Sequence, residues 1–191
     1  MNFYLIDYML VIMLAFSVYF DITKRKIPNI ITMPAILIGI IWSTVDSGVN
    51  GFLFSIFGFL FGLAVFFIPY ISGGIGAGDV KLMAAIGALK GWRFTLISTF
   101  GTAFAGGVIV IGYMIYKGKL ISTLINTLGL IIKPLAKWLF KVSGNKKTLQ
   151  IYQYFDEKKS ENSNDYIPYA IAISIGVIVA LFGVFEELIK I

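Results

Sequence analysis

Cysteine and histidine are absent from this chain of 191 residues, and charged residues make up only 14% of it. The missing cysteines exclude disulfides and zinc–thiolate sites, and the missing histidines exclude imidazole catalysis. Any hydrolytic chemistry must therefore use carboxylates, hydroxyl groups or lysines. We accordingly predict neither a metal nor a cofactor.

Hydrophobic residues are abundant instead. They make up 58% of the chain, against about 45–50% in a typical soluble domain. They gather in runs long enough to cross a lipid bilayer, which takes roughly 20 apolar residues per helix. These runs predict an all-α polytopic membrane protein with six transmembrane helices. The expected spans are residues 2–20, 30–45, 51–71, 79–89, 94–116 and 166–188. The first run lacks signal-peptide features, so we interpret it as a retained span.

The net charge of +6 follows from membrane topology rather than from nucleic-acid binding. Basic residues gather in the loop 21–29, at Lys81 and in the segment 117–165, which holds nine lysines. Six helices place these regions on one side of the bilayer, and the positive-inside rule makes that side cytoplasmic. Asp7 is expected near the outer surface. The basic residues on the outer side are Lys90, Arg93 and Lys190.

The segment 117–165 is the one extended polar region. Its first half, 119–141, mixes apolar residues with lysines in an amphipathic pattern, which favours a helix in the membrane interface over a seventh crossing. Its second half, 143–165, is rich in Lys, Asn, Ser and Glu and is typical of a flexible cytoplasmic loop. We expect a single membrane-embedded domain over residues 1–191, with this loop inside it.

Two of the ten acidic residues stand at the expected membrane boundary. Asp21 ends the first span, and Asp79 begins the fourth, directly after a glycine-rich run. An ionisable residue at that depth is costly and indicates function. Two carboxylates held close share one proton, and such a pair can hydrolyse a peptide bond. Gly76 and Gly78 would let the backbone approach a partner helix or a substrate closely.

Each of these residues also has a purely structural interpretation. Asp21 alone is typical of a boundary acid paired with Lys24 or Arg25. Asp79 alone is typical of a helix cap that follows a glycine loop. Lys81 fits an anchor at the membrane surface. Residue chemistry by itself therefore predicts a candidate acid pair and no particular reaction.

Three segments make the sequence resemble a known family, the type IV prepilin peptidases. Asp21-Ile-Thr-Lys-Arg-Lys-Ile-Pro-Asn29, followed by Thr32 and Pro34, resembles the family's first motif. Gly76-Ala-Gly-Asp-Val-Lys-Leu-Met83, continuing to Gly87, resembles the second motif, the GxGD signature. Ile167-Pro-Tyr-Ala170 is similar to a third, weaker element. The three segments span most of the chain in the family's order.

This resemblance implies a six-helix GxGD aspartyl protease with Asp21 and Asp79 as its catalytic pair. It also implies that the enzyme cuts the short basic leader from prepilins, preflagellins or similar proteins at the cytoplasmic face of the cell membrane. The cut usually follows a glycine just before the substrate's hydrophobic helix. Which aspartate acts as the base stays open. The residues that would support the motifs or bind substrate are Pro28, Asn29, Gly76, Gly78 and Lys81.

The larger bacterial members carry an N-terminal zinc-binding four-cysteine motif and also N-methylate the new terminus. The present sequence starts at the first span and has no cysteine. It therefore resembles the peptidase-only members found in Flp/Tad pilus systems and among archaeal prepilin and preflagellin peptidases. We expect neither methylation nor zinc. The bacterial and archaeal branches, like the oligomeric state, both stay open.

Other functions fit parts of the sequence. A presenilin-like intramembrane protease also uses GxGD, but its first motif is Tyr-Asp and it has a Pro-Ala-Leu element, whereas here Phe20 precedes Asp21 and Pro-Ala-Leu is missing. A small ion- or proton-coupled transporter could use Asp21 and Asp79 as ion sites and the glycine run as a broken helix. That interpretation leaves Ile27-Pro-Asn29 unexplained. The two aspartates together argue against a catalytically silent assembly protein.

Overall fold

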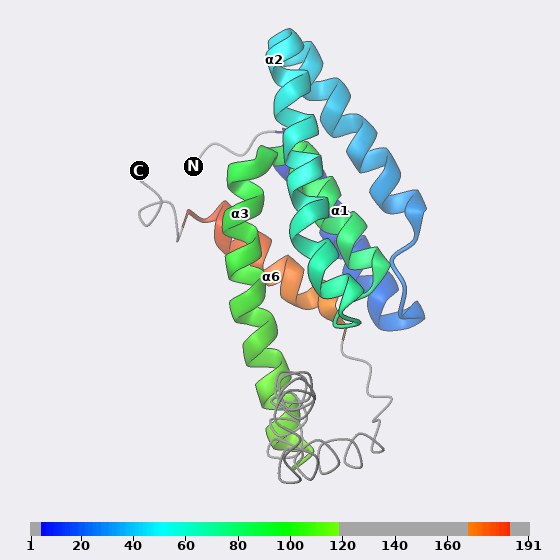
Figure 1. Cartoon of the computed structure of the whole chain (residues 1–191). Coiled ribbons are helices and arrows are strands. Elements are labelled where there is room, and N and C mark those ends of the chain that lie inside the picture. The colour runs from blue at the N-terminus through cyan, green and yellow to red at the C-terminus, as the bar shows by residue number, and fades with distance from the viewer. Residues whose placement is uncertain (1–4, 119–167, 184–191) are drawn as a thin grey trace, which may run out of the picture. The chain divides into compact units, whose positions relative to one another are not determined.

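The computed structural model describes residues 5–118 and 168–183. Every regular element in these ranges is a helix (Figure 1). The helices are α1 (Leu5–Lys24), α2 (Asn29–Ile71), α3 (Ala77–Tyr116) and α6 (Tyr169–Leu181). The first three are long and apolar enough to cross a membrane, and α6 is a shorter apolar helix. The predicted all-helical, membrane-type architecture is thereby confirmed, and the number of six spans stays a prediction.

Helix α2 consists of two arms joined at Ser47 and Gly48. Ser47 has φ −132° and ψ 17°, and Gly48 has φ 59° and ψ −135°, so neither residue is helical. Glycine adopts a positive φ without a clash at Cβ, which allows the chain to turn here. Figure 1 shows α2 running to this bend and returning beside itself. The two arms correspond to the second and third spans expected from the sequence.

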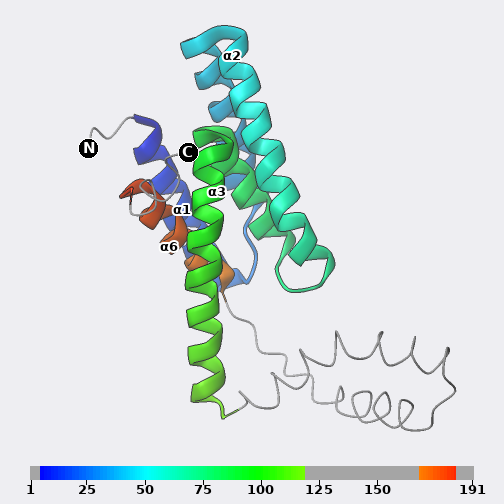
Figure 2. The same cartoon turned by 60° about the vertical axis from the view of Figure 1, so that its left-hand side comes forward.

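Helix α3 is broken in the same way at Gly91, which has φ 77° and ψ 174°. The bend is visible in Figure 2, where α3 turns back on itself. A Cβ atom at Gly91 would collide with the ring of Phe54. A glycine is therefore required here both for the backbone conformation and for the space. The first arm runs from Ala77 to the bend, close to the range expected for the fourth span.

Helix α1 continues four residues beyond its expected end at Phe20. The N–H group of Arg25 donates to the carbonyl oxygen of Asp21 at 3.0 Å and closes the last helical turn. Asp21 is 3% exposed, so its side chain faces the interior rather than the loop. The expectation that Asp21 begins the first loop is therefore wrong. The buried side chain of Asp21 accepts a hydrogen bond from the backbone of α6, which is described below.

The first arm of α3 is the centre of the packing. Almost every side chain between Val80 and Leu89 is buried, which is unusual for a helix with one apolar stripe. Helices α1 and α2 lie side by side, as do α1 and α6. The fully buried large side chains of this core are Leu10, Leu82, Met83, Ile86, Ile173 and Val177. The outward faces of α1 and α2 are apolar and exposed, as lipid contact demands.

Glycines join the second arm of α2 to the first arm of α3. A Cβ atom at Gly58 would collide with the carbonyl oxygen of Gly87, and one at Gly62 would collide with that of Met83. The two backbones therefore touch directly, as at other small-residue interfaces in membrane proteins. The hydroxyl of Ser55 donates to the carbonyl oxygen of Ala88 at 2.7 Å along the same seam.

Asp7, expected near the outer surface, is buried inside the protein with 4% exposure. Its Oδ1 atom lies 2.6 Å from the ammonium nitrogen of Lys90. The pair joins the start of α1 to the end of the first arm of α3. Because a carboxylate buried without a partner is costly, this ion pair fixes the two helices relative to each other at that end.

The chain divides into two compact units, one made of Met1–Val108 with Ile167–Ile191 and the other of Ile109–Tyr166. The described part of the second unit is the end of α3, where the ammonium group of Lys117 lies 4.9 Å from the ring centre of Tyr113. The amphipathic and polar segment predicted over 119–165 lies outside the described residues. All the residues considered next belong to the first unit.

Candidate functional site

Asp21 is held by the beginning of α6. The backbone N–H of Ala170 donates to the Oδ2 atom of Asp21 at 3.1 Å. Ala170 lies in the first turn of α6, where amides have no partner within the helix and the helix dipole favours negative charge. Pro168 precedes that turn with an extended backbone and cannot itself donate. The start of α6 therefore binds the Asp21 carboxylate much as helix N-termini bind anions.

Asp79 is held by the glycine-rich loop before α3. Its Oδ2 atom accepts a hydrogen bond from the N–H of Gly76 at 3.0 Å, and its own N–H donates to the carbonyl oxygen of Gly76 at 3.1 Å. This reciprocal pair closes the loop onto the first turn of α3, so Asp79 caps the helix. Its Oδ1 atom is buried and has no hydrogen-bond partner among the residues that the structure describes. That oxygen is therefore available to a proton, a water molecule or a substrate.

The two aspartates come from distant parts of the sequence and lie on neighbouring segments of the fold. They lie close enough for their charges to interact. The exposed fraction is 3% for Asp21 and 7% for Asp79. Two buried carboxylates at one place are the arrangement that general acid–base hydrolysis uses. The structure therefore brings the predicted pair together, and their catalytic role stays a prediction.

Gly78 allows the first loop to lie against the second. A Cβ atom at Gly78 would come within 3.0 Å of the Cβ atom of Ile27 and 3.2 Å of its backbone nitrogen. Ile27 is 4% exposed, so it fills the space that the glycine leaves. At Gly76 the nearest atom to an added Cβ would be the Oδ2 of Asp79, at 3.3 Å. Both glycines thus permit close backbone approaches, as their spacing predicts.

Asn29 and Lys81 form a second link between the two motif segments. The ammonium group of Lys81 donates to the Oδ1 atom of Asn29 at 2.9 Å. Pro28 precedes α2 in an extended conformation, with φ −75° and ψ 147°, and places Asn29 as the first residue of the helix. All seven predicted site residues therefore lie on three neighbouring segments: the end of α1, the start of α2 and the start of α3.

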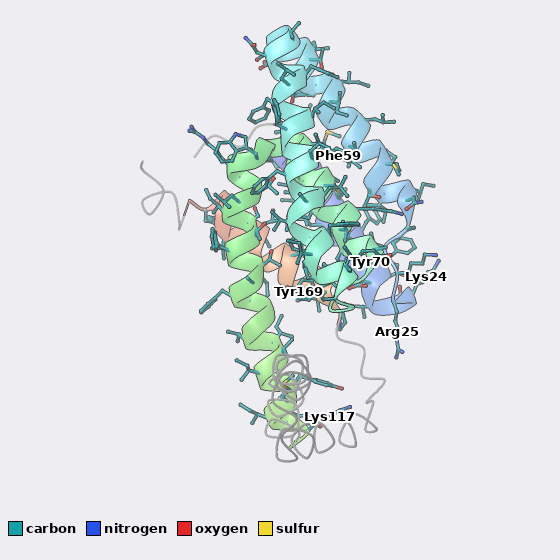
Figure 3. The ribbon with its side chains drawn as sticks, in the orientation of Figure 1. Lys24, Arg25, Phe59, Tyr70, Lys117 and Tyr169 are labelled. Carbon is teal, nitrogen blue, oxygen red and sulfur yellow. The ribbon has the colours of Figure 1, made fainter. Side chains whose placement is uncertain are left out.

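The sequence did not assign a role to α6, although the structure places its first turn at the aspartates. Tyr169 lies within electrostatic reach of Asp79, and its ring centre lies 6.4 Å from that of Phe66 in the second arm of α2. Figure 3 labels Tyr169 at the start of α6, at the end of the unit where Lys24 and Arg25 are also labelled. The weak third motif was the only available signal, because a backbone N–H carries no signature in sequence.

In the described part of the chain, no group of three or more acidic side chains is placed to hold a metal ion. The hydrogen bonds described above, from Ala170 to Asp21 and from Gly76 to Asp79, both come from backbone amides, which donate and cannot accept protons.

Comparison with known proteins gives one match. The sequence model of the type IV leader peptidase family matches residues 8–111. This range includes Asp21, Asp79 and both motif segments, and it ends before the polar segment. No curated protein and no solved structure matches the chain.

Proposed function

We propose a function for this chain on the premise that it belongs to the type IV leader peptidase family. Membership makes the chain a protease of prepilin-like substrates that works in a membrane environment. Our proposal adds the chemistry, the residues and the side of the membrane. The chain would act as one peptidase domain, an aspartyl endopeptidase in which Asp21 and Asp79 hydrolyse the bond after the basic leader.

The observation that supports this proposal is that two buried carboxylates, Asp21 in α1 and Asp79 in α3, lie within electrostatic reach of each other. One carboxylate, ionised, takes a proton from a water molecule as the water oxygen attacks the carbonyl carbon of the scissile bond. The other, protonated, donates to the carbonyl oxygen. As the tetrahedral intermediate collapses and the carbon–nitrogen bond breaks, the leaving nitrogen takes the proton that the first carboxylate received from water. A hydroxyl group of the intermediate returns a proton to the second carboxylate. The buried Oδ1 of Asp79 has no hydrogen-bond partner within residues 5–118 and 168–183 and can take part in these transfers.

The membrane topology proposed here has six spans. Helix α1 supplies the first, the arms of α2 and α3 supply the next four, and the segment containing α6 supplies the last. The basic residues Lys24, Arg25 and Lys26, at the end of α1 and just after it, then lie on the cytoplasmic side together with both aspartates. A substrate helix would enter from the bilayer while its cationic leader stays at the cytoplasmic face. The scissile bond would lie at that boundary.

The 191 residues contain no cysteine for the zinc-binding motif that accompanies methylation in larger relatives. The proposed reaction is therefore peptide-bond hydrolysis without N-methylation. Mass spectrometry of the cleaved substrate would test this part separately. The proposal expects a new terminus just before the hydrophobic helix with no added methyl group. A methylated product would contradict it, and a cut inside the helix would indicate presenilin-like proteolysis.

The catalytic assignment is tested by co-expressing a prepilin with Asp21→Asn or Asp79→Asn variants of the full chain. Each amide keeps the size of the carboxylate but cannot shuttle a proton, so both variants should lose leader removal. The control is Arg93→Gln, since Arg93 is an exposed charged residue just after the bend of α3. Thermal unfolding in detergent would confirm that each variant folds. Leader removal at the wild-type rate by either folded site variant would overturn the assignment.

A further inference from the structure

A second polar pocket lies at the other end of the helices. Its volume is about 470 Å³, within the range of small-molecule sites. Along α3 it is separated from Asp79 by the eleven residues up to Lys90, which at 1.5 Å per residue is about 16 Å. It is lined by the start of α1, both sides of the bend in α2 and the end of the first arm of α3. The proposed peptidase reaction makes no use of it.

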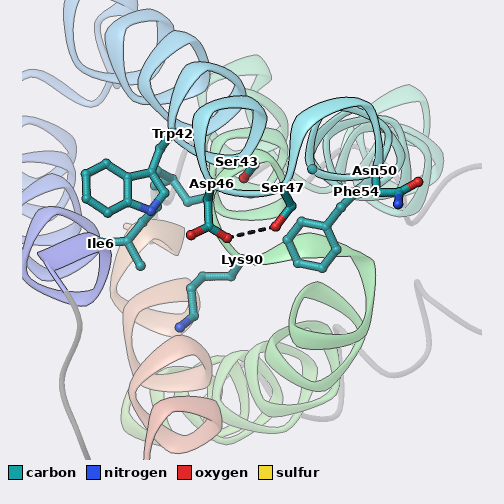
Figure 4. Close-up of a pocket in the computed structure, with 10 residues that line it drawn as sticks. Ile6, Trp42, Ser43, Asp46, Ser47, Asn50, Phe54 and Lys90 are labelled. Carbon is teal, nitrogen blue, oxygen red and sulfur yellow. Dashed lines mark hydrogen bonds between the residues drawn. The ribbon is translucent and has the colours of Figure 1, made fainter.

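The walls of this pocket combine aromatic rings with a carboxylate. Figure 4 shows Asp46 between the rings of Trp42 and Phe54, with the Lys90 side chain below. Trp42 and Phe54 are 45% and 46% exposed, so their faces are open to a ligand. The remaining polar groups are the hydroxyl of Ser43, that of Ser47 and the amide of Asn50. A pocket that combines aromatic rings with a carboxylate is a favourable setting for an organic cation.

The charges around the pocket leave one anion uncompensated. Lys90 is already neutralised by Asp7, at 2.6 Å on the far side of its ammonium group. The Oδ2 atom of Asp46 accepts a hydrogen bond from the hydroxyl of Ser47 at 2.8 Å. Within residues 5–118 and 168–183, no lysine or arginine forms an ion pair with Asp46. The pocket therefore attracts a cation.

A metal ion fits this pocket poorly. Calcium needs six to eight oxygen ligands and magnesium a near-octahedral shell. The pocket provides one carboxylate, two hydroxyl groups and one amide, and its other lining residues are the cationic Lys90 and apolar side chains or glycine. An alkylammonium group fits better, because its N–H groups donate to Asp46 and its neighbours while its carbon chain lies against the rings. Tryptophan at the end of an apolar helix is also typical of the depth at which lipid headgroups lie.

We propose that the pocket formed by Trp42, Asp46, Phe54 and Lys90 binds an alkylammonium group, and that the ethanolamine headgroup of a phospholipid is one source of that group. The ammonium is held by the Asp46 carboxylate and by the faces of the two rings. The Lys90 ammonium, fixed by Asp7, keeps the floor of the pocket in place and can donate to the phosphate of the same headgroup.

The test uses the purified full chain in detergent and in nanodiscs, with native mass spectrometry as the readout. The probes are phosphatidylethanolamine, phosphatidylglycerol as an anionic lipid without an amine, and soluble butylammonium. Wild-type protein should retain phosphatidylethanolamine over phosphatidylglycerol. Asp46→Asn should abolish this preference, and Trp42→Leu should weaken binding by about twofold to thirtyfold, the range that a cation–π contact supplies.

Trp92→Leu is the matched control, because Trp92 is equally exposed at 42% but does not line the pocket. Its binding should equal that of the wild type. Competition by butylammonium would indicate that the ammonium alone suffices, whereas retention of the lipid against butylammonium would identify the headgroup as the ligand. Wild-type binding by Asp46→Asn, or equal losses in Trp42→Leu and Trp92→Leu, would overturn the proposal. Leader removal is measured separately, so neither proposal depends on the other.

Discussion

Lys81 donates from its ammonium group to the Oδ1 atom of Asn29 at 2.9 Å, across 52 residues of sequence. The bond joins the first turn of α3, which carries Asp79, to the first turn of α2, which follows the loop containing Ile27. The two motif segments are therefore connected by side chains as well as by the packing of Ile27 on Gly78. The relative position of the two loops depends on both contacts.

The first prediction concerns this hydrogen bond. Asn29→Ala should lower the free energy of unfolding by about 1 kcal/mol or less, the value of one such bond. Lys81→Met should cost a similar amount, and the double variant should cost no more than either single one, because both remove the same contact. Unfolding in detergent measures the three values, with Asn50→Ala as a control asparagine elsewhere in α2. Additive losses would show that the two side chains act independently.

A second prediction concerns the space at Gly78. Gly78→Ala should cost about 1–3 kcal/mol of stability because its methyl group would press on Ile27. It should also reduce leader removal, since the loop carrying Asp79 must shift. Ile27→Val should not recover either loss when combined with it, because valine keeps the Cβ atom and the backbone nitrogen that the new methyl group would meet. Gly74→Ala is the control in the same loop, because its added Cβ would make only an ordinary contact with Pro69. Equal effects at the two glycines would contradict this explanation.

The buried ion pair gives a third prediction. Lys90→Met should destabilise the protein by about 3 kcal/mol because the Asp7 carboxylate, which is 4% exposed, loses this ion pair. Asp7→Asn should cost less, because the Lys90 side chain is 21% exposed. The double variant Asp7→Asn with Lys90→Met should be more stable than either single variant. Equilibrium unfolding of the wild type, both single variants and the double variant gives the double-mutant cycle. A double variant that shows the sum of the two single losses would mean that the charges do not interact.

The fourth prediction concerns the glycine seam between α2 and α3. Gly58→Ala and Gly87→Ala should each be strongly destabilising, since the methyl group would meet a backbone carbonyl that cannot rotate away. Gly107→Ala is the control, because an added Cβ there has nothing within 4 Å. It should be neutral or slightly stabilising, as alanine favours a helix over glycine. Thermal unfolding compares the three variants, and similar midpoints would exclude close packing as the cause.

Much of the fold could be predicted from the sequence because each membrane helix needs a long run of apolar residues, which is easily recognised. The apolar runs predicted the helices, and the breaks in α2 and α3 lie where Gly48 and Gly91 supply turn chemistry. The end of α1 was placed too early. A charged residue after an apolar run normally marks the membrane surface, whereas Asp21 is inside the packed helices, and only tertiary contacts reveal this.

The site was predictable only in part. Asp21 and Asp79 could be found because the chemistry lies in side chains with a recognisable spacing. The amide of Ala170 could not, because every residue except proline has one and its use depends on how α6 docks. The partnership of Asp7 with Lys90 was missed for the same reason, since 83 residues separate them and no local pattern links them.

The contact between Ala170 and Asp21 also sets an order of events during synthesis. The aspartate is made 149 residues before the amide that binds it. At roughly 5–20 residues per second, a ribosome takes about 7 to 30 s to cover that interval. Both aspartates are therefore already in the nascent chain while the binding group for the first is still unmade. Docking of α6 is the step that completes this hydrogen bond, and a chain interrupted before α6 is made lacks the Ala170 amide that binds Asp21.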